Sequence, residues 1–193
     1  MKQRVAYFIL GLVAGVLVTG SLSAVYIFNL KDSFTTVVER SGDPDLPRDT
    51  SASAYREMWE WSLRDPSGKV VRLAEFRGKV VVIHLWATWC GPCVKELPEI
   101  QSLYDSLRND GIIFLVVSRE DDFLVEGFLR HEPYTFPAYS TTEREPDVFQ
   151  TDGAWGAIPS TIVLDRSGVI RLKQAGSAVW TEPKTLRFFR SLL

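Results

Sequence analysis

From about residue 56 onwards, short apolar runs of strand length alternate with segments whose apolar residues recur at helical spacing. The short runs are rich in Val, Ile and Leu and are bounded by Gly, Asp or Pro, which favours buried strands. This alternation predicts an α/β domain with a central mixed β-sheet flanked by helices and with antiparallel edge strands. The expected strands are 79–86, 111–118, 134–139 (short or merely extended), 161–164 and 169–176, and the expected helices are 93–107, 121–130, 145–150 and 181–193.

A different pattern fills the amino-terminal part, where residues 5–30 contain no charged side chain. A helix of that length spans roughly 39 Å at about 1.5 Å per residue, enough to cross a bilayer with some tilt. Lys2 and Arg4 precede the run, so the positive-inside rule predicts that residues 1–4 are cytoplasmic. The alternative is a signal peptide cleaved near residues 21–24. Because the apolar run continues beyond that point, we favour an uncleaved single transmembrane helix.

The remaining chain divides into a linker and one domain. Residues 31–55 include a Pro, Ser and Asp cluster at 43–51 with little to bury, which is typical of a linker. Residues 56–193 are enough for a single hydrophobic core. A formal net charge of −2 gives no basic footprint for nucleic acid. The orientation of the predicted anchor places the domain on the extracytoplasmic side of the membrane.

The chain contains only two cysteines, Cys90 and Cys93, separated by Gly91 and Pro92. Structural disulfide frameworks contain more cysteines and zinc sites need four ligands, so the pair indicates a redox dithiol. The pair lies between the expected strand 79–86 and a helix, where backbone N–H groups and the helix dipole stabilise a thiolate. We therefore expect Cys90 to attack a disulfide and the more buried Cys93 to resolve the mixed disulfide.

A second segment of interest is Ile158-Pro159, which directly precedes the expected strand 161–164. X-Pro bonds are the only peptide bonds with ready access to the cis form, although a trans proline at the start of a strand is the ordinary case. Taken alone, the segment leaves both forms open.

Together the two segments resemble the thioredoxin superfamily, and more closely its TlpA/ResA-like membrane-anchored branch. In that branch the distal proline, here Pro159, is cis and faces the dithiol, and the backbone of the preceding Ile158 pairs with a substrate strand. The resemblance also implies that Trp89, Gly91 and Pro92 contact the substrate. The residues that carry it are 80–93 with the Trp-Cys-Gly-Pro-Cys core, 95–98 and 158–161, while 59–79 resembles the amino-terminal β-hairpin of the branch.

The resemblance implies a thiol-disulfide oxidoreductase tethered to the bacterial inner membrane, with its catalytic domain in the periplasm. It favours reduction of client disulfides, such as those met in cytochrome c or copper-site maturation, with electrons from a membrane-embedded thiol donor and no cofactor. One alternative is a disulfide oxidant for secreted proteins. Another is a metal-delivery module that binds copper through the dithiol. A site formed by Cys90, Cys93 and His84 would also suit copper or zinc. Peroxide reduction is disfavoured, because its attacking thiol normally lacks a CxxC partner.

Resolution of a mixed disulfide requires Cys93 to lose a proton in a low-dielectric pocket, so a base is expected nearby. ResA-like members carry Glu three residues after the second cysteine, and Glu96 occupies that position, one helical turn from Cys93. Thioredoxins carry an acidic residue where this chain has His84, which is either a core histidine or a second proton-handling group.

The other aromatic residues and the second histidine suggest simpler roles. Trp86 and Trp89 flank the dithiol and are expected to exclude water from it. His131 is expected at the surface, and packing alone is expected of Trp59, Trp61 and Trp180.

Overall fold

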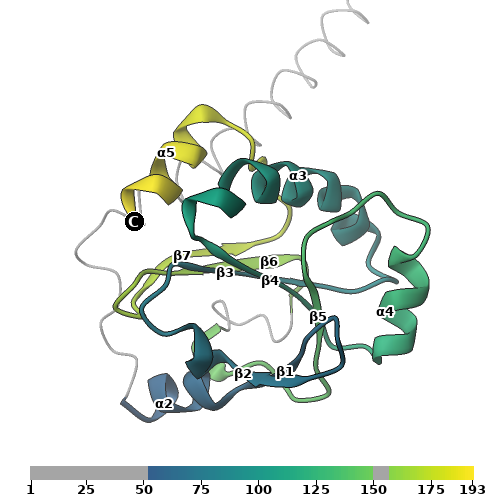
Figure 1. Ribbon diagram of the computed structural model, residues 1–193, viewed down its shortest axis with the longest axis horizontal. Helices are drawn as coiled ribbons and strands as arrows, with labels where there is room; N and C mark the ends of the chain where they lie inside the picture. Colours follow the sequence, from purple (N-terminus) through teal and green to yellow (C-terminus); the bar gives the residue numbers. More distant parts are fainter. Residues whose placement is uncertain (1–51, 150–156) are drawn as a thin grey trace, which may run out of the picture. The chain divides into compact units, whose positions relative to one another are not determined.

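The computed structural model describes residues 52–149 and 157–193, which form a seven-stranded mixed sheet with helices against it (Figure 1). The strands lie in the order β2-β1-β5-β4-β3-β6-β7. Their bounds are β1 Ser62–Arg64, β2 Val70–Arg72, β3 Val81–Trp86, β4 Ile113–Ser118, β5 Ala138–Ser140, β6 Ser160–Leu164 and β7 Ile170–Ala175. The helices are α2 (Ala52–Glu60), α3 (Gly91–Leu107), α4 (Asp122–Leu129) and α5 (Pro183–Ser191), and 3-10 turns occupy Leu73–Phe76, Arg108–Asp110 and Asp147–Phe149.

Strand β3 lies in the middle of the sheet and leads directly to the cysteine pair. It pairs in parallel with β4 and antiparallel with β6, so the expected mixed sheet is confirmed. The expected antiparallel edge strand is also confirmed, because β7 pairs only with β6. The β1–β2 hairpin forms the other edge, in agreement with the hairpin expected within residues 59–79.

The two faces of the central strands bury different sets of side chains, because successive residues of a strand point to opposite faces. One face packs against α2 and the hairpin, below the sheet in Figure 1. The opposite face carries Val82, His84 and Trp86 and lies under α3, whose Tyr104 packs edge-on against Phe114 of β4 at 5.4 Å between ring centroids. The first core includes Met58, Trp59, Trp61, Leu63, Val81, Ile83, Leu85, Leu115, Val117 and Ile162.

Helix α2 is held by its contact with the turn between β6 and β7. Gly168 in that turn has φ of +82°, and a Cβ atom there would lie 2.5 Å from the Trp59 ring. Glycine is therefore required twice, once for the backbone conformation and once for the close approach of Trp59. The Asp165 carboxylate fixes the same turn by accepting the N–H groups of Ser167 and Val169.

Three local differences from the sequence-based expectations concern boundaries. Residues 52–55, expected at the end of the linker, form the first turn of α2. Strand β5 begins at Ala138, late in the expected segment 134–139, and a 3-10 turn at Asp147–Phe149 stands within the expected helix 145–150. In each case tertiary packing of a short segment outweighs local propensity.

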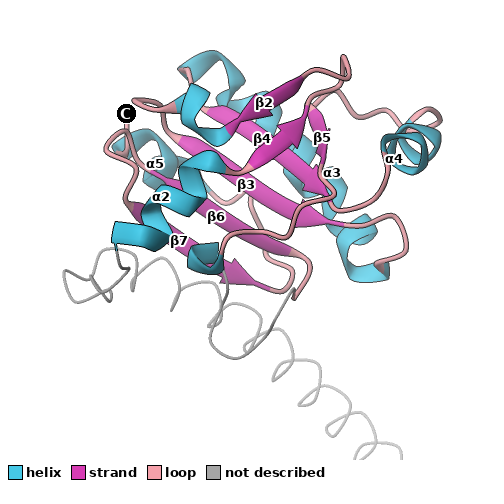
Figure 2. Ribbon diagram, turned by 90° about the horizontal axis from the view of Figure 1, so that it is seen from below, coloured by secondary structure: helices cyan, strands magenta, loops and turns pink. Residues whose placement is uncertain are grey.

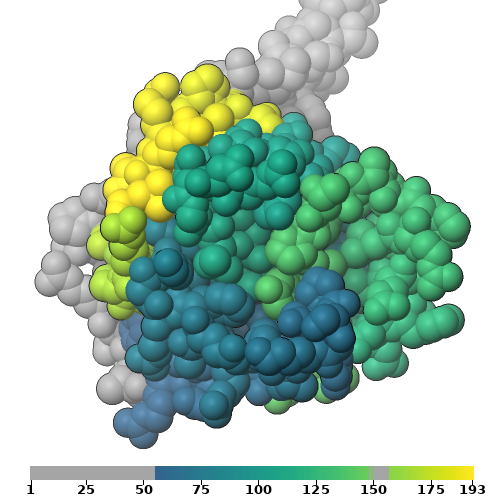
Figure 3. Space-filling view, viewed as in Figure 1, coloured from purple at the N-terminus to yellow at the C-terminus, as the bar shows by residue number. Residues whose placement is uncertain are grey.

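Helices α3 and α5 cover the sheet on the side opposite α2 (Figure 1). Both helices lie at the surface in the space-filling view (Figure 3), and Figure 2 shows the sheet from the α2 side. The expected membrane span at 5–30 and most of the linker lie outside the described residues. Within residues 52–149 and 157–193, no helix is long and apolar enough to cross a membrane.

Candidate active site

Cys90 occupies the N-cap position of α3, directly after the loop that leaves β3. Its extended backbone (φ −85°, ψ 98°) lets its carbonyl accept the first helical bond from the N–H of Val94 at 3.0 Å. The N–H of Cys93 donates to the Cys90 sulfur at 3.3 Å. A donor in this position, together with the helix dipole, stabilises a thiolate at Cys90, as the sequence predicts.

The two cysteines are joined in a disulfide, with their Cα atoms 5.2 Å apart. The sulfur environments differ, because Cys93 is fully buried while 6% of Cys90 is exposed. The expected burial of Cys93 is confirmed. Gly91 and Pro92 lie between them in the exposed first turn of α3, where the missing N–H of proline leaves no helical bond unmade.

The Ile158-Pro159 segment lies beside the cysteines although it is far away in sequence. The Ile158–Pro159 peptide bond is cis, which confirms the conformation implied by the family resemblance. The carbonyl oxygen of Ile158 lies 3.8 Å from the Cys90 sulfur, and Pro159 is buried at the start of β6. The structure thus brings Cys90 and Ile158 together, as expected.

The two tryptophans that flank the dithiol in sequence behave differently. Trp86 is buried and packs against Phe128 of α4 at 5.5 Å between ring centroids. Trp89 is 74% exposed, so most of its ring faces solvent, and its expected role in excluding water from the disulfide stays a prediction. Trp89 and Ile158 instead line one groove of about 230 Å³, whose wall also includes Glu120.

Glu96 belongs to the second turn of α3 and is buried, with 3% of its surface exposed. Its Oε1 atom accepts hydrogen bonds from the indole N–H of Trp180 at 2.5 Å and from the backbone N–H of Ala178 at 3.0 Å, whereas its buried Oε2 atom has no hydrogen-bond partner among the residues that the structure describes. Burial raises the pKa of the Glu96 carboxyl, and the Trp180 and Ala178 hydrogen bonds oppose this rise. The neighbouring Glu99 raises it further. Such a carboxyl stays protonated to a higher pH than an exposed one and suits proton exchange.

Trp180 was expected only to pack, and it is indeed fully buried. Its hydrogen bond to Glu96 joins positions 84 residues apart in sequence. A buried tryptophan usually needs a hydrogen-bond partner for its indole N–H, but the sequence does not show that this partner is Glu96.

His84 is buried on the α3 side of β3. Its Nδ1 atom lies 2.9 Å from the hydroxyl oxygen of Thr161 on the neighbouring strand β6, and within residues 52–149 and 157–193 its Nε2 atom has no hydrogen-bond partner. Burial lowers the pKa of His84 to about 3, so the ring is neutral throughout the physiological range. These features favour the core-histidine interpretation over a proton-handling one.

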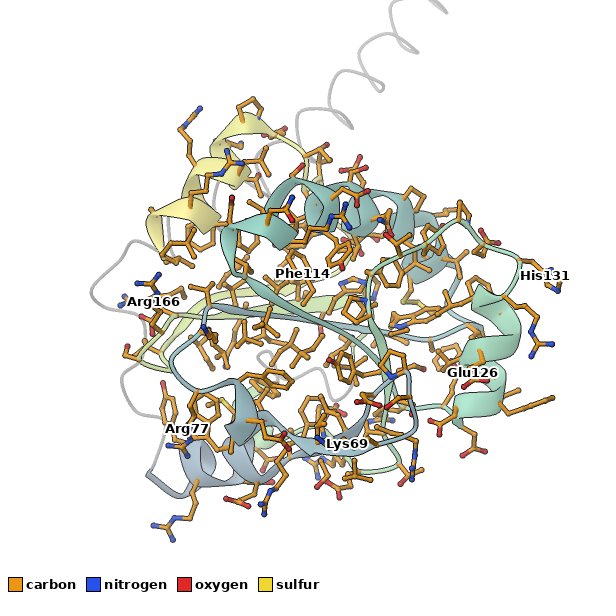
Figure 4. All side chains as sticks on the ribbon, in the orientation of Figure 1. Lys69, Arg77, Phe114, Glu126, His131 and Arg166 are labelled. Atoms are coloured by element: carbon orange, nitrogen blue, oxygen red, sulfur yellow. A yellow bond between two sulfur atoms is a disulfide. The ribbon has the colours of Figure 1, made fainter. Side chains whose placement is uncertain are left out.

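Two further expectations can be placed. His131 is exposed at the end of α4, as expected (Figure 4). Among the residues that the structure describes, no three His, Cys, Asp or Glu side chains gather as a metal site.

Sequence reasoning missed Glu120, which follows β4 and accepts hydrogen bonds from Thr88 in the loop before Cys90. No local pattern marks it, because an isolated acidic residue after a strand is ordinary in a surface loop.

Known proteins resemble this chain in sequence or in fold. The chain is 33% identical over 113 residues to the thiol-disulfide oxidoreductase ResA of Geobacillus thermodenitrificans strain NG80-2, covering 58% of this chain and 63% of the relative. It is 30% identical over 116 residues to the sporulation thiol-disulfide oxidoreductase A of Bacillus subtilis strain 168, covering 55% and 68%. The match to ResA thus spans less than two thirds of that relative.

Among solved structures, StoA from Bacillus subtilis superposes with a TM-score of 0.52 at 22% identity, covering 68% of this chain and 94% of StoA. The exposed lipoprotein thioredoxin of Streptococcus pneumoniae strain TIGR4 gives a TM-score of 0.54 at 20% identity, covering 69% and 98%. At these identities the likeness shows the fold, which is thioredoxin-like. The model of the AhpC/TSA family matches residues 55–173, from the amino-terminal hairpin through the dithiol to β7, and the chain therefore belongs to the AhpC/TSA family.

Proposed function

We propose that this protein is a thiol-disulfide oxidoreductase that reduces disulfides of client proteins through Cys90 and Cys93. The observation that carries the proposal is the placement of the Cys90 sulfur, at the N-cap of α3 and 3.8 Å from the Ile158 carbonyl oxygen. The names of the relatives support it, since ResA and the sporulation protein are both described as thiol-disulfide oxidoreductases.

The reaction proceeds in two exchange steps. The Cys90 thiolate attacks one sulfur of the client disulfide, forms a mixed disulfide and releases the other client sulfur as a thiolate. The Cys93 thiolate then attacks the Cys90 sulfur, closes the Cys90–Cys93 disulfide and releases the second client thiol. Two electrons pass to the client, and an external dithiol must reduce the protein before the next cycle.

The client approaches along the groove lined by Trp89 and Ile158. An extended client segment that pairs with the backbone of Ile158 would bring its disulfide to Cys90, and main-chain pairing tolerates varied sequences. Gly91 and Pro92 are exposed beside the sulfur and complete the contact surface.

Glu96 is proposed to take the proton that Cys93 loses before the second step. Its Oε2 atom is buried and accepts no hydrogen bond from the described part of the chain, and a carboxyl with a raised pKa is a stronger base once ionised than an exposed one. The indole of Trp180 holds the other oxygen and fixes the orientation of the carboxyl.

We further propose that residues 5–30 anchor the domain in the bacterial inner membrane with the active site in the periplasm. The absence of charge across that run supports the proposal. In this arrangement a membrane-embedded thiol donor supplies the electrons, and the clients are proteins of cytochrome c or copper-site maturation.

The direction of electron flow is tested by measuring the reduction potential of the Cys90–Cys93 couple against glutathione buffers. A reductase should lie nearer to thioredoxin, at about −270 mV, than to the strong oxidant DsbA, at about −120 mV. A potential above about −150 mV would favour the oxidant alternative.

A further inference from the structure

We propose that Glu120 is a positioning residue: it holds the loop that carries Trp89 in place, so that Trp89 and Ile158 form one client-binding groove next to Cys90. This inference rests on the proposed function and adds a specificity-determining residue to it.

Both oxygens of the Glu120 carboxylate accept hydrogen bonds from the loop that carries Trp89. Its Oε2 atom accepts the backbone N–H of Thr88 at 2.6 Å, and its Oε1 atom accepts the Thr88 hydroxyl at 2.7 Å. This is bidentate attachment of one residue, which fixes both the position and the rotation of the loop backbone at Thr88. Hydrogen bonds to a charged acceptor are stronger than neutral ones.

The carboxylate is itself held by the sheet. The Ser118 hydroxyl donates to Glu120 Oε2 at 3.0 Å and accepts the Glu120 backbone N–H at 3.2 Å. Ser118 is fully buried at the end of β4, in register with Trp86 at the end of β3. Glu120 therefore connects the rigid end of β4 to the loop that β3 feeds into.

The loop needs such a support because its principal side chain provides little packing of its own. Trp89 is 74% exposed, so burial does not determine where its ring lies. The backbone is tied on the other side by the N–H of Cys90, which donates to the carbonyl of Ala87 at 3.1 Å. The backbone is therefore held at Thr88 and at Cys90, the residues on either side of Trp89. The Thr88–Glu120 contact thereby determines the direction in which Trp89 points.

The groove places Glu120 at the site of client contact. Trp89, Ile158 and Glu120 line the same space of about 230 Å³, and the carbonyl oxygen of Ile158 lies 3.8 Å from the Cys90 sulfur. Since all three hydrogen-bond donors to Glu120 are uncharged, the carboxylate is suited to geometry rather than to an ion pair. The nearby Arg119 is paired instead with Glu145 at 2.8 Å.

Variants can separate geometry from charge. In Glu120→Ala all three acceptor contacts are lost. In Glu120→Gln the amide oxygen can keep the Thr88 N–H and Ser118 contacts, and the amide nitrogen can donate to the Thr88 hydroxyl oxygen, so the loop keeps its place without the charge. Asp121→Asn is the matched control, because Asp121 is the exposed neighbour whose side chain makes no capping hydrogen bond.

The test compares two disulfides: a short peptide closed by one Cys-X-X-Cys disulfide, and the small aromatic disulfide DTNB, which needs no groove. For Glu120→Ala we expect the ratio of peptide to DTNB rates to fall about tenfold, chiefly through a higher KM for the peptide, because misplacement of a contact surface weakens productive binding. Glu120→Gln should restore most of the ratio, and Thr88→Val should give an intermediate loss. Equal losses for both disulfides, or the same loss in Asp121→Asn, would overturn the proposal.

Amide hydrogen exchange provides a readout that does not depend on catalysis. The Thr88 N–H should lose its protection in Glu120→Ala and keep it in Glu120→Gln and Asp121→Asn. If the unmodified protein reduces neither disulfide, the proposed function fails. If it reduces both but Thr88 stays protected in Glu120→Ala, only the role of Glu120 fails.

Discussion

Two carboxylates close to the dithiol, Glu96 and Glu120, have opposite surroundings. Glu96 is buried and uses one oxygen to accept two N–H donors, while its other oxygen has no partner in the part of the chain that the structure describes. Glu120 is only partly buried and uses both oxygens for three donors. A carboxylate with a spare buried oxygen and a raised pKa is suited to proton exchange, whereas one whose two oxygens both accept hydrogen bonds from the surrounding loop and strand is suited to holding their geometry. The comparison shows that the hydrogen bonds accepted by each carboxylate oxygen distinguish a proton-exchanging role from a positioning role better than closeness to the dithiol does.

The largest expected effect comes from Glu96→Gln. Gln keeps the shape but cannot take a proton, so release of the mixed disulfide should slow about a hundredfold, within the usual range for general base catalysis. In the unmodified protein the rate should rise with pH through the raised pKa of Glu96, and the variant should lose that rise. Stopped-flow measurement of the second exchange step from pH 4 to 9 checks both.

Glu99→Gln is the control for that prediction. Glu99 raises the pKa of Glu96 by repulsion, so its removal should keep the pH-dependent rise but move it to lower pH. If Glu96→Gln and Glu99→Gln gave the same flat profile, Glu96 would not be the base.

A smaller effect is expected from Trp180→Phe, which removes the N–H donor to Glu96 and keeps an aromatic ring. Because that hydrogen bond lowers the pKa of Glu96, its loss should move the rise in rate to higher pH and slow exchange at pH 7 about threefold. Trp61→Phe is the control: it removes a buried indole whose N–H has no hydrogen-bond partner among the described residues, so it reproduces the loss of side-chain volume in Trp180→Phe without the loss of a hydrogen bond. An equal shift in Trp61→Phe would attribute the effect to packing.

The smallest kinetic effect is expected from His84→Asn, which should change exchange rates less than about twofold, since a neutral ring with a pKa near 3 handles no proton at neutral pH. Stability should respond instead. The folded pKa lies below the ordinary value of 6.5, so the unmodified protein loses stability as pH falls from 6.5 towards 3, by up to about 1.4 kcal/mol per pH unit, and the variant should lack that slope.

Urea unfolding at several pH values measures this slope. Glu96 should contribute a slope of stability against pH of the opposite sign, because its raised pKa makes the unmodified protein lose stability as pH rises above the ordinary value of 4.5.

A pH–rate profile altered in His84→Asn but not in Glu96→Gln would reverse the assignment of the two groups.

The sequence predicted the parts of the site that are local in the chain. A CxxC pair between a strand and a helix places its first cysteine at the start of the helix and its second one turn further in. The N-cap position of Cys90 and the burial of Cys93 could therefore be predicted from the sequence. The central strands could be predicted too, because their runs of β-branched residues are unambiguous.

Contacts between distant segments could not be predicted. Whether Glu96 is buried depends on where α3 meets Trp180, and whether Glu120 matters depends on the loop at Thr88. Helix α2 was missed because a nine-residue helix is marginal alone and is stabilised here by Trp59 packing on Gly168. The exposure of Trp89 belongs to the same class, since nothing local determines it.

The most direct test of the central claim is covalent trapping with Cys93→Ser. If Cys90 attacks the client disulfide and Cys93 resolves the product, this variant should accumulate a mixed disulfide with the Cys-X-X-Cys peptide, attached at Cys90 and released by added dithiol. Intact-mass and peptide-mapping spectrometry would locate the bond, and Cys90→Ser should trap far less. Accumulation of the adduct on Cys93 in Cys90→Ser, with none on Cys90 in Cys93→Ser, would contradict the assignment of the two cysteines.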